Sequence, residues 1–249
     1  EKTKSLELLK EYLNFGGYPR IVLEDELSEK LLLIGEIYQS YIEKDISYLL
    51  KVHKIEAFGR LVKLMAAEEG NIIKLTELSS ELGISIKTLK DYLWYLEKTF
   101  IINRVYPFFK NIRKELSKST IFYFYDIGLR NFTSGEFGNL KDYGFVFQNF
   151  IYNILREKLK NSIDTIYFWR TKDKAEIDFV IEKGKNIIPV EVKYKHLKSP
   201  LITRAMRSFI EKYRVDKAIV FNLSLKDKIK IETTEILILP YYESLFNIL

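Results

Sequence analysis

Two carboxylates, Asp178 and Glu191, are the residues of this chain best placed to do chemistry. They lie in the stretch Ala175–Tyr194, where apolar and polar residues alternate with a period of two over two segments, which is typical of half-buried strands. Two carboxylates facing each other on one sheet surface, about 5 Å apart, repel by roughly 3 kcal/mol at an effective dielectric of about 20. A divalent cation between them would reverse the sign of that interaction, so the pattern indicates a metal site.

A two-residue turn at Gly184-Lys185 is expected to set the register of the two strands. Gly at the first turn position favours a type II′ hairpin, in which the numbers of facing residues sum to a constant. Asp178 then faces Glu191, and Glu176 faces Lys193. The apolar face is expected to carry Ile177, Phe179, Ile181, Ile188, Val190 and Val192. The alternative interpretation is a solvated face on which the Glu and Lys side chains form ion pairs.

The hairpin resembles the active-site core of the restriction-endonuclease-like superfamily, often written PD-(D/E)xK. The matching residues are Asp178, followed by Glu191-Val192-Lys193. The resemblance implies that Asp178 and Glu191 hold Mg²⁺ and that Lys193 orients the attacking water. Phosphodiester hydrolysis requires a Lewis acid and a hydroxide-like nucleophile, and Mg²⁺ prefers oxygen ligands.

The composition is that of a basic, globular chain. Of its 249 residues 47% are hydrophobic, and 40 Lys and Arg oppose 34 Asp and Glu, which gives a net charge of +6 and a pI near 9.1. This length predicts one or two domains, and the positive charge suits an anionic partner. The absence of Cys excludes disulfides, thiolate nucleophiles and Cys-ligated zinc. The two His residues are expected at the surface, which argues against a Ser-His-Asp hydrolase.

Signals for targeting are absent from the sequence. No apolar run approaches the length of a membrane span and no signal peptide is visible, so we expect no membrane partner and a cytoplasmic location. The chain opens with Glu1 rather than Met, which suggests a fragment or a processed product. The sequence leaves the oligomeric state open.

A helix-turn-helix pattern occupies residues 74–100. A short helix to Leu82, a turn at Gly83-Ile84-Ser85 and a longer helix to Glu97 are expected, with Ser85 as the N-cap of the second helix. Two strand-like runs, 101–109 and 120–125, follow with basic residues between them, as in a winged helix. The residues expected to contact DNA are Ser85, Lys87, Lys90, Arg113 and Lys114. The alternative is that this part is a spacer or a protein-binding module.

The remaining segments predict an α/β sandwich within a chain that is α+β overall. Helices are expected over 4–13, 26–52 and 55–68, and after a polar linker over 143–159 and about 201–213. Strands are expected over 165–170, 217–222 and 235–239, besides the hairpin. The domains are therefore a helical connector over 1–70, the winged helix-turn-helix over 71–134 and the restriction-endonuclease-like domain over 135–249.

The order of several short motifs resembles the C-terminal portion of an archaeal and bacterial AAA-type ATPase family. The motifs are Gly16-Gly17-Tyr18-Pro19, the winged-helix tract, Tyr125-Asp126-Ile127-Gly128-Leu129-Arg130, Gly144–Asn149, Trp169-Arg170-Thr171 and Glu176-Ile177-Asp178. The resemblance implies an ATPase domain upstream in the full-length protein. No phosphate loop is present in this chain, so we expect it neither to bind nor to hydrolyse ATP.

The chain departs from the family pattern at Gln148, where the family places Glu on the first helix of the nuclease-like domain. An amide oxygen brings no negative charge, so the resemblance implies a weak Mg²⁺ site. The expected function is a DNA-binding, nuclease-like module. The alternatives are a module of the same fold that binds DNA or a protein without cleavage, and a regulatory interaction domain.

Overall fold

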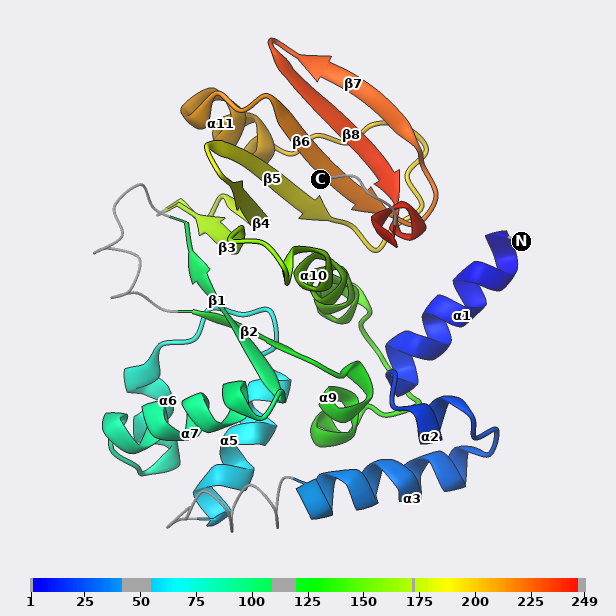
Figure 1. Ribbon diagram of the computed structural model, residues 1–249, viewed down its shortest axis with the longest axis vertical. Coiled ribbons are helices and arrows are strands. Elements are labelled where there is room, and N and C mark those ends of the chain that lie inside the picture. The colour runs from blue at the N-terminus through cyan, green and yellow to red at the C-terminus, as the bar shows by residue number, and fades with distance from the viewer. Residues whose placement is uncertain (1, 42–54, 109–119, 172, 246–249) are drawn as a thin grey trace. The chain divides into compact units, whose positions relative to one another are not determined.

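The computed structural model describes residues 2–41, 55–108, 120–171 and 173–245, and its chain divides into two compact units (Figure 1). The first unit comprises residues 1–104 and 119–146, and the second comprises 105–118 and 147–249. Helices and a mixed sheet together make an α+β fold, which confirms the predicted fold class. No helix in the described parts of the chain is both long and apolar enough to cross a bilayer.

The first unit is mainly helical. Its helices are α1 (Lys2–Phe15), α2 (Pro19–Val22), α3 (Leu27–Ile37), α5 (Ile55–Ala67), α6 (Leu75–Leu82), α7 (Ile86–Lys98) and α9 (Ile127–Ser134). Strand β2 (Ile121–Phe124) and the start of strand β1 (Ile102–Pro107) also belong to it. The long helix expected over 26–52 is confirmed for its α3 part, whereas 42–54 lie outside the described residues. Helix α9 was not predicted from the sequence.

Helices α6 and α7 form the expected helix-turn-helix pair. Gly83 ends α6 with φ +62, a left-handed conformation that glycine adopts without a steric penalty. Ser85 is the N-cap of α7, and its Oγ accepts the backbone N–H of Thr88 at 3.0 Å. The turn and the cap are therefore confirmed, and the exposed first turn of α7 is fixed by a hydrogen bond.

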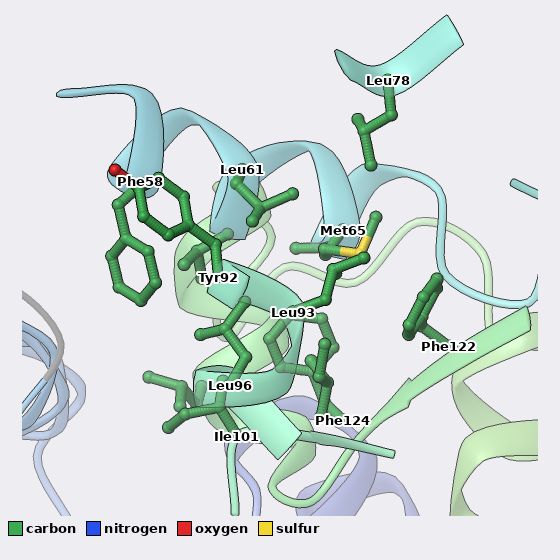
Figure 2. Packing of buried hydrophobic residues seen from close by; sticks show 14 of the residues in the cluster. Phe58, Leu61, Met65, Leu78, Tyr92, Leu93, Leu96, Ile101, Phe122 and Phe124 are labelled. Carbon is green, nitrogen blue, oxygen red and sulfur yellow. The ribbon is translucent and has the colours of Figure 1, made fainter. Parts of the chain in front are cut away.

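The core of the first unit is built from one face each of α5, α7 and β2 (Figure 2). Phe58 of α5 meets Tyr92 of α7 edge to face, with ring centroids 5.3 Å apart. The other side chains labelled in Figure 2 are buried: Leu61, Met65, Leu78, Leu93, Leu96, Ile101, Phe122 and Phe124. Each such side chain contributes roughly 1.5–3 kcal/mol by leaving water, so this core is what holds α7 in place.

Two of the motifs singled out in the sequence pack against each other within the first unit. Asp126 accepts the N–H of Leu129 and the N–H of Gly17, both at 2.8 Å, so its carboxylate caps α9 and also holds the chain after α1. A Cβ on Gly128 would lie 2.0 Å from the carbonyl oxygen of Phe15. The close approach of the two backbones explains why the motifs at 16–19 and 125–130 are rich in glycine.

The second unit contains a mixed sheet in the order β1-β3-β4-β5-β6-β8-β7. The last residues of strand β1 join this sheet, because Tyr106 and Pro107 pair in parallel with Tyr167 and Phe168 of β3. The pairs β3–β4, β4–β5 and β7–β8 are antiparallel, and β5–β6 and β6–β8 are parallel. The strands are β3 (Thr165–Arg170), β4 (Glu176–Lys183), β5 (Asn186–Val192), β6 (Lys217–Asn222), β7 (Asp227–Ile231) and β8 (Thr234–Pro240). Strand β7 was not predicted.

The predicted hairpin register is confirmed over most of its length. Facing pairs run from Lys183 with Asn186 to Phe179 with Val190. Gly184 has φ +61, as the first position of the expected turn requires. The pairing of β4 with β5 ends at Phe179, one residue short of Asp178, so the two carboxylates are not a ladder pair.

A bulge in β4 explains why the ladder changes near Asp178. Val180 faces Tyr167 on β3, but Ile177 faces Trp169, so Asp178 and Phe179 together oppose one residue of β3. Such an extra residue interrupts the alternation of the strand. The expectation that Ile177 and Phe179 share one apolar face was therefore wrong for Ile177.

Helices α10 (Gly144–Leu159) and α11 (Arg204–Tyr213) pack on opposite faces of this sheet. Phe179 contacts Tyr152 of α10, with ring centroids 5.8 Å apart. Its neighbour Val180 points the other way and belongs with Ile177 to the buried cluster that includes α11. The last element among the described residues is the short 3-10 helix η2 (Tyr241–Leu245).

Candidate functional site

Asp178 lies at the β4 bulge and both of its carboxylate oxygens accept hydrogen bonds. Oδ2 accepts the backbone N–H of Val192 at 2.6 Å, and Oδ1 accepts the side-chain amide of Gln148 at 3.2 Å. Gln148 is buried and comes from the first turns of α10. The side chain of Asp178 thus continues the contact between β4 and β5 where their backbone pairing has ended.

Glu191 is the more deeply buried carboxylate of the site, with 1% of its surface exposed, whereas Asp178 is partly exposed. Its Oε1 accepts a hydrogen bond from the hydroxyl of Thr203, the residue that caps α11. Its Oε2 lies 3.6 Å from Nζ of Lys193, and among the described residues it has no hydrogen-bond partner. One oxygen of Glu191 is therefore held in place, while the other is buried with an unused lone pair.

Burial dominates the electrostatics of this cluster. It raises the pKa of Asp178 to about 7, against the opposing effects of Lys193 and of the Val192 N–H, and the negative charges of Glu191 and Glu176 raise it further. Burial also raises the pKa of Glu191, although the positive charge of Lys193 and the Thr203 hydroxyl act against it. Lys193 is the cation that both carboxylates share.

Glu176 is paired differently from the expectation. It forms its ion pair with Arg170 on β3, at 3.6 Å, whereas Lys193 forms its ion pair with Glu191. Lys193 still acts on Glu176, because its charge opposes the rise that burial gives the pKa of this carboxyl. The bulge accounts for the change, since it shifts the pairing of Glu176 relative to Asp178.

The donor set of the site fits a hard cation only in part. In the described chain, no three His, Cys, Asp or Glu residues come together in a way that could hold a metal ion. Mg²⁺ is nevertheless bound in many sites by one or two carboxylates together with waters and phosphate oxygens. Glu191, whose buried Oε2 accepts no hydrogen bond in the described chain, and Asp178 supply the two carboxylates of such a site, although both oxygens of Asp178 already accept hydrogen bonds. The amide of Gln148 would have to rotate to offer its oxygen, because its nitrogen now faces Asp178.

The residues expected to contact DNA are only partly within the described chain. Lys87 and Lys90 are exposed at the start of α7, and Ser85 is exposed but uses its Oγ to cap that helix. Arg113 and Lys114 lie outside the described residues. The first two turns of α7 therefore present Lys87 and Lys90 to solvent on a helix whose opposite face is anchored in the core.

Thr203 is a site residue that the sequence analysis missed. The helix was expected to begin at about Leu201, whereas α11 begins at Arg204 with Thr203 as its cap, accepting the N–H of Met206 at 3.0 Å. A Thr just before a helical pattern is a capping signal that could have located this boundary. Its second contact, with Glu191, depends on the fold and has no signal in the sequence.

Two family models match the chain. A model described as "Domain of unknown function (DUF8612)" matches residues 6–139, and one described as "Domain of unknown function (DUF4143)" matches residues 143–242. The first match covers the helix-turn-helix pair. The second covers every residue of the acidic cluster, which comprises Gln148, Glu176, Asp178, Glu191, Lys193 and Thr203. Both halves of the chain therefore have counterparts in other proteins.

The curated relatives that match this chain are longer than it is. An uncharacterized protein of Methanocaldococcus jannaschii is 25% identical over 255 residues, which cover 98% of this chain and 56% of that protein. An uncharacterized protein of Haemophilus influenzae is 24% identical over 195 residues, covering 76% and 46% respectively. One of Mycobacterium tuberculosis is 26% identical over 174 residues, covering 68% and 38%. The chain thus spans about half the length of the curated relatives it matches.

Proposed function

The chain belongs to the family described as a domain of unknown function (DUF8612), and from this premise we propose that it is a DNA-binding, nuclease-like module with a weak site for a divalent cation. In this proposal residues 71–134 act as a winged helix and the second unit as a PD-(D/E)xK domain. The full-length protein carries an AAA-type ATPase domain upstream. The observation that carries the proposal is the buried Oε2 of Glu191, which has no hydrogen-bond partner in the described chain and lies beside Lys193.

The chemistry proposed for the site is phosphodiester hydrolysis. Asp178 and Glu191 would hold Mg²⁺, which supplies Lewis-acid chemistry when bound. Thr203 keeps the carboxylate of Glu191 in one orientation through its hydroxyl. The ammonium of Lys193, 3.6 Å from Glu191 and partly exposed, is positioned to orient a water or a phosphate oxygen.

Metal titration of the 249-residue chain tests the enzymatic part of this proposal. We expect weak binding of Mg²⁺ and tighter binding of Mn²⁺ by calorimetry, because Mn²⁺ binds better to such ligand sets. Cleavage of single- or double-stranded DNA should require the metal and should be lost in Lys193→Met. Lys195→Met, at an exposed position two residues away, is the matched control and should retain cleavage. Absence of binding for both metals would refute the metal site.

A second function, DNA binding without cleavage, is favoured by one specific contact. The amide of Gln148 donates to Asp178, so the metal-free protein already satisfies an oxygen that a metal would need. Under this alternative the chain binds DNA equally well in chelator and in Mn²⁺, and no metal restores cleavage. The same titration with a DNA panel therefore distinguishes the two functions.

DNA binding is tested through the basic residues of the proposed winged helix. We expect a variant with Ala at Lys87, Lys90, Arg113 and Lys114 to bind DNA more weakly and to lower the slope of log affinity against log salt by up to about 4. The matched control replaces four exposed lysines elsewhere, Lys4, Lys10, Lys63 and Lys198, with Ala. Equal weakening in both variants would show that net charge alone drives binding and would remove the winged helix from the proposal.

A further inference from the structure

A pocket of about 300 Å³ lies in the second unit where the β4–β5 turn meets the end of α11 and the start of β6. Its lining comes from two segments that are far apart in the sequence, 183–188 and 213–217. The residues are Lys183, Lys185, Asn186, Ile187, Ile188, Tyr213, Arg214, Val215, Asp216 and Lys217. From Asp178 to Lys183 is five residues along β4, or about 17 Å at about 3.3 Å per residue, so this pocket is separate from the acidic cluster.

The lining of the pocket is strongly cationic. Lys183, Lys185, Arg214 and Lys217 contribute four positive charges, against the single negative charge of Asp216. Within the described residues, no ion pair involves Lys183, Lys185 or Arg214. Lysines of the neighbouring strand β7 and the loop before it do have partners: Lys226 pairs with Glu243, and Lys228 with Glu235. Lys183, Lys185 and Arg214 therefore bring positive charge to the pocket that no ion pair among the described residues balances.

The pKa of Lys217 is affected both by burial and by its charged neighbours. Burial lowers the pKa of its ammonium, and the positive charge of Lys183 lowers it further, although Glu235 acts in the opposite direction. Two like charges close enough to affect each other in a partly desolvated place repel, and an anion between them would relieve the repulsion.

The fold supplies a structural reason for two of the four cations, since Lys217 faces Glu235 on β8 and Arg214 ends α11, but not for Lys183 and Lys185. Arg214 caps the C-terminus of α11, where the helix dipole favours a positive charge. It does so in a left-handed conformation with φ +49, which is uncommon for a residue other than Gly. Lys183 and Lys185 flank Gly184 in an exposed turn, and neither the turn nor the helix dipole requires a cation there.

We infer that this pocket binds a phosphate ester, with the phosphate group among the four cations. The volume is at the lower end of that of small-molecule sites and exceeds the needs of a phosphate group alone. Ile187 and Val215, which lie on the same side of the sheet, provide an apolar wall for the organic part of the ester. A free nucleotide and a nucleotide of a DNA strand both offer this chemistry. The inference does not depend on the proposed nuclease function, because it uses none of the residues of the acidic cluster.

The test uses the 249-residue chain with inorganic phosphate, adenosine 5′-monophosphate and a thymidine octanucleotide as probes. Amide signals of residues 183–188 and 213–217 should shift with adenosine monophosphate, and to a smaller extent with inorganic phosphate. Lys183→Gln/Lys185→Gln should weaken binding of adenosine monophosphate about tenfold. Lys198→Gln/Lys230→Gln removes the same charge from exposed positions outside the pocket and should leave the affinity unchanged.

Competition between the octanucleotide and adenosine monophosphate distinguishes the two sources of the phosphate group. Displacement of adenosine monophosphate by the octanucleotide would identify a nucleic-acid strand as the phosphate source, and lack of displacement would identify a free nucleotide. Lys217→Met, on the strand rather than in the turn, provides a second variant that should weaken binding by the same mechanism. Equal affinities in the pocket and control variants, or no shift of the pocket signals with any probe, would overturn the inference.

Discussion

The backbone N–H of Val192 donates a 2.6 Å hydrogen bond to Oδ2 of Asp178. This bond links β5 to a side chain of β4 at the point where backbone pairing between these strands has stopped. The carboxylate therefore has a structural role in addition to its proposed role as a metal ligand. Substitutions at Asp178 and at its other partner, Gln148, are expected to affect fold stability and metal affinity in different directions.

Gln148→Glu should destabilise the metal-free protein and strengthen metal binding. The substitution removes an N–H donor to Asp178 and places a second carboxylate beside it, which costs about 1–3 kcal/mol. In Mn²⁺ the same carboxylate becomes a ligand, so the midpoint of thermal unfolding should recover or rise above that of the parent. Melting curves in chelator and in Mn²⁺ measure both effects.

Gln148→Met is the matched control for that experiment, because it removes the donor without adding charge. It should lower the melting temperature in chelator and gain nothing from Mn²⁺. If Gln148→Glu and Gln148→Met respond alike to Mn²⁺, then residue 148 is not close enough to the metal to bind it.

Asp178→Asn should abolish metal binding and stabilise the protein at pH 8. The folded-state pKa of about 7 lies above the unfolded value of 3.8, so the parent loses stability as pH rises through this window. Asn keeps an oxygen for the Val192 N–H, and its amide can donate to the oxygen of a rotated Gln148. The advantage of Asn should be present at pH 8 and small at pH 4, as measured by urea unfolding. Destabilisation at pH 8 together with unchanged Mn²⁺ affinity would mean that the carboxylate is structural only.

Two Gly→Ala substitutions in the first unit should have opposite effects, because only Gly128 lies at the close backbone contact between the end of α1 and α9. Gly128→Ala should cost more than about 3 kcal/mol, because its Cβ would lie 2.0 Å from the Phe15 carbonyl oxygen and both backbones would have to move. Gly59→Ala, inside α5 with no atom within 4 Å of the added Cβ, should stabilise by roughly 0.5–1 kcal/mol. Denaturant unfolding of the two variants checks the pair, and comparable effects of the same sign would contradict the contact.

The buried carboxyl of Glu69 should make the stability of the first unit depend on pH. Burial raises its pKa to about 7 although Arg130 lies 3.1 Å away and lowers it. Since the unfolded value is about 4.5, the folded state loses stability as pH rises from about 4.5 to 7, by up to about 3 kcal/mol for the full shift. Glu69→Gln should flatten this part of the stability profile relative to the parent. Parallel profiles in the two proteins would show that Glu69 does not titrate in this range.

The hairpin could be predicted from the sequence because its determinants are local. Gly184 fixes the turn, the turn fixes the register, and alternation from Phe179 to Lys183 then follows without reference to the rest of the chain. The same reasoning located Ser85 as a cap and Gly83 as a turn, since a cap needs only a side chain and the backbone three residues later.

Other parts of the site depend on contacts between distant segments. The bulge that places Ile177 with Val180 arises from the pairing of β4 with β3, and periodicity within β4 does not reveal it. The contact between Thr203 and Glu191 requires the chain to return to the sheet through α11. The orientation of the Gln148 amide depends on Asp178, 30 residues away. Each of these features is a tertiary interaction, which residue spacing alone does not encode.

The pairing of β1 with β3 in the sheet of the second unit has a consequence for anyone who shortens this protein. Tyr106 and Pro107 cover the outer edge of β3, yet they come almost 40 residues before α10. A fragment cut at residue 143, where the second family model begins, would leave the N–H and C=O groups of that edge open to other chains. Such a fragment is expected to self-associate, and a peptide carrying the β1 sequence should restore the monomer by adding the missing strand in trans.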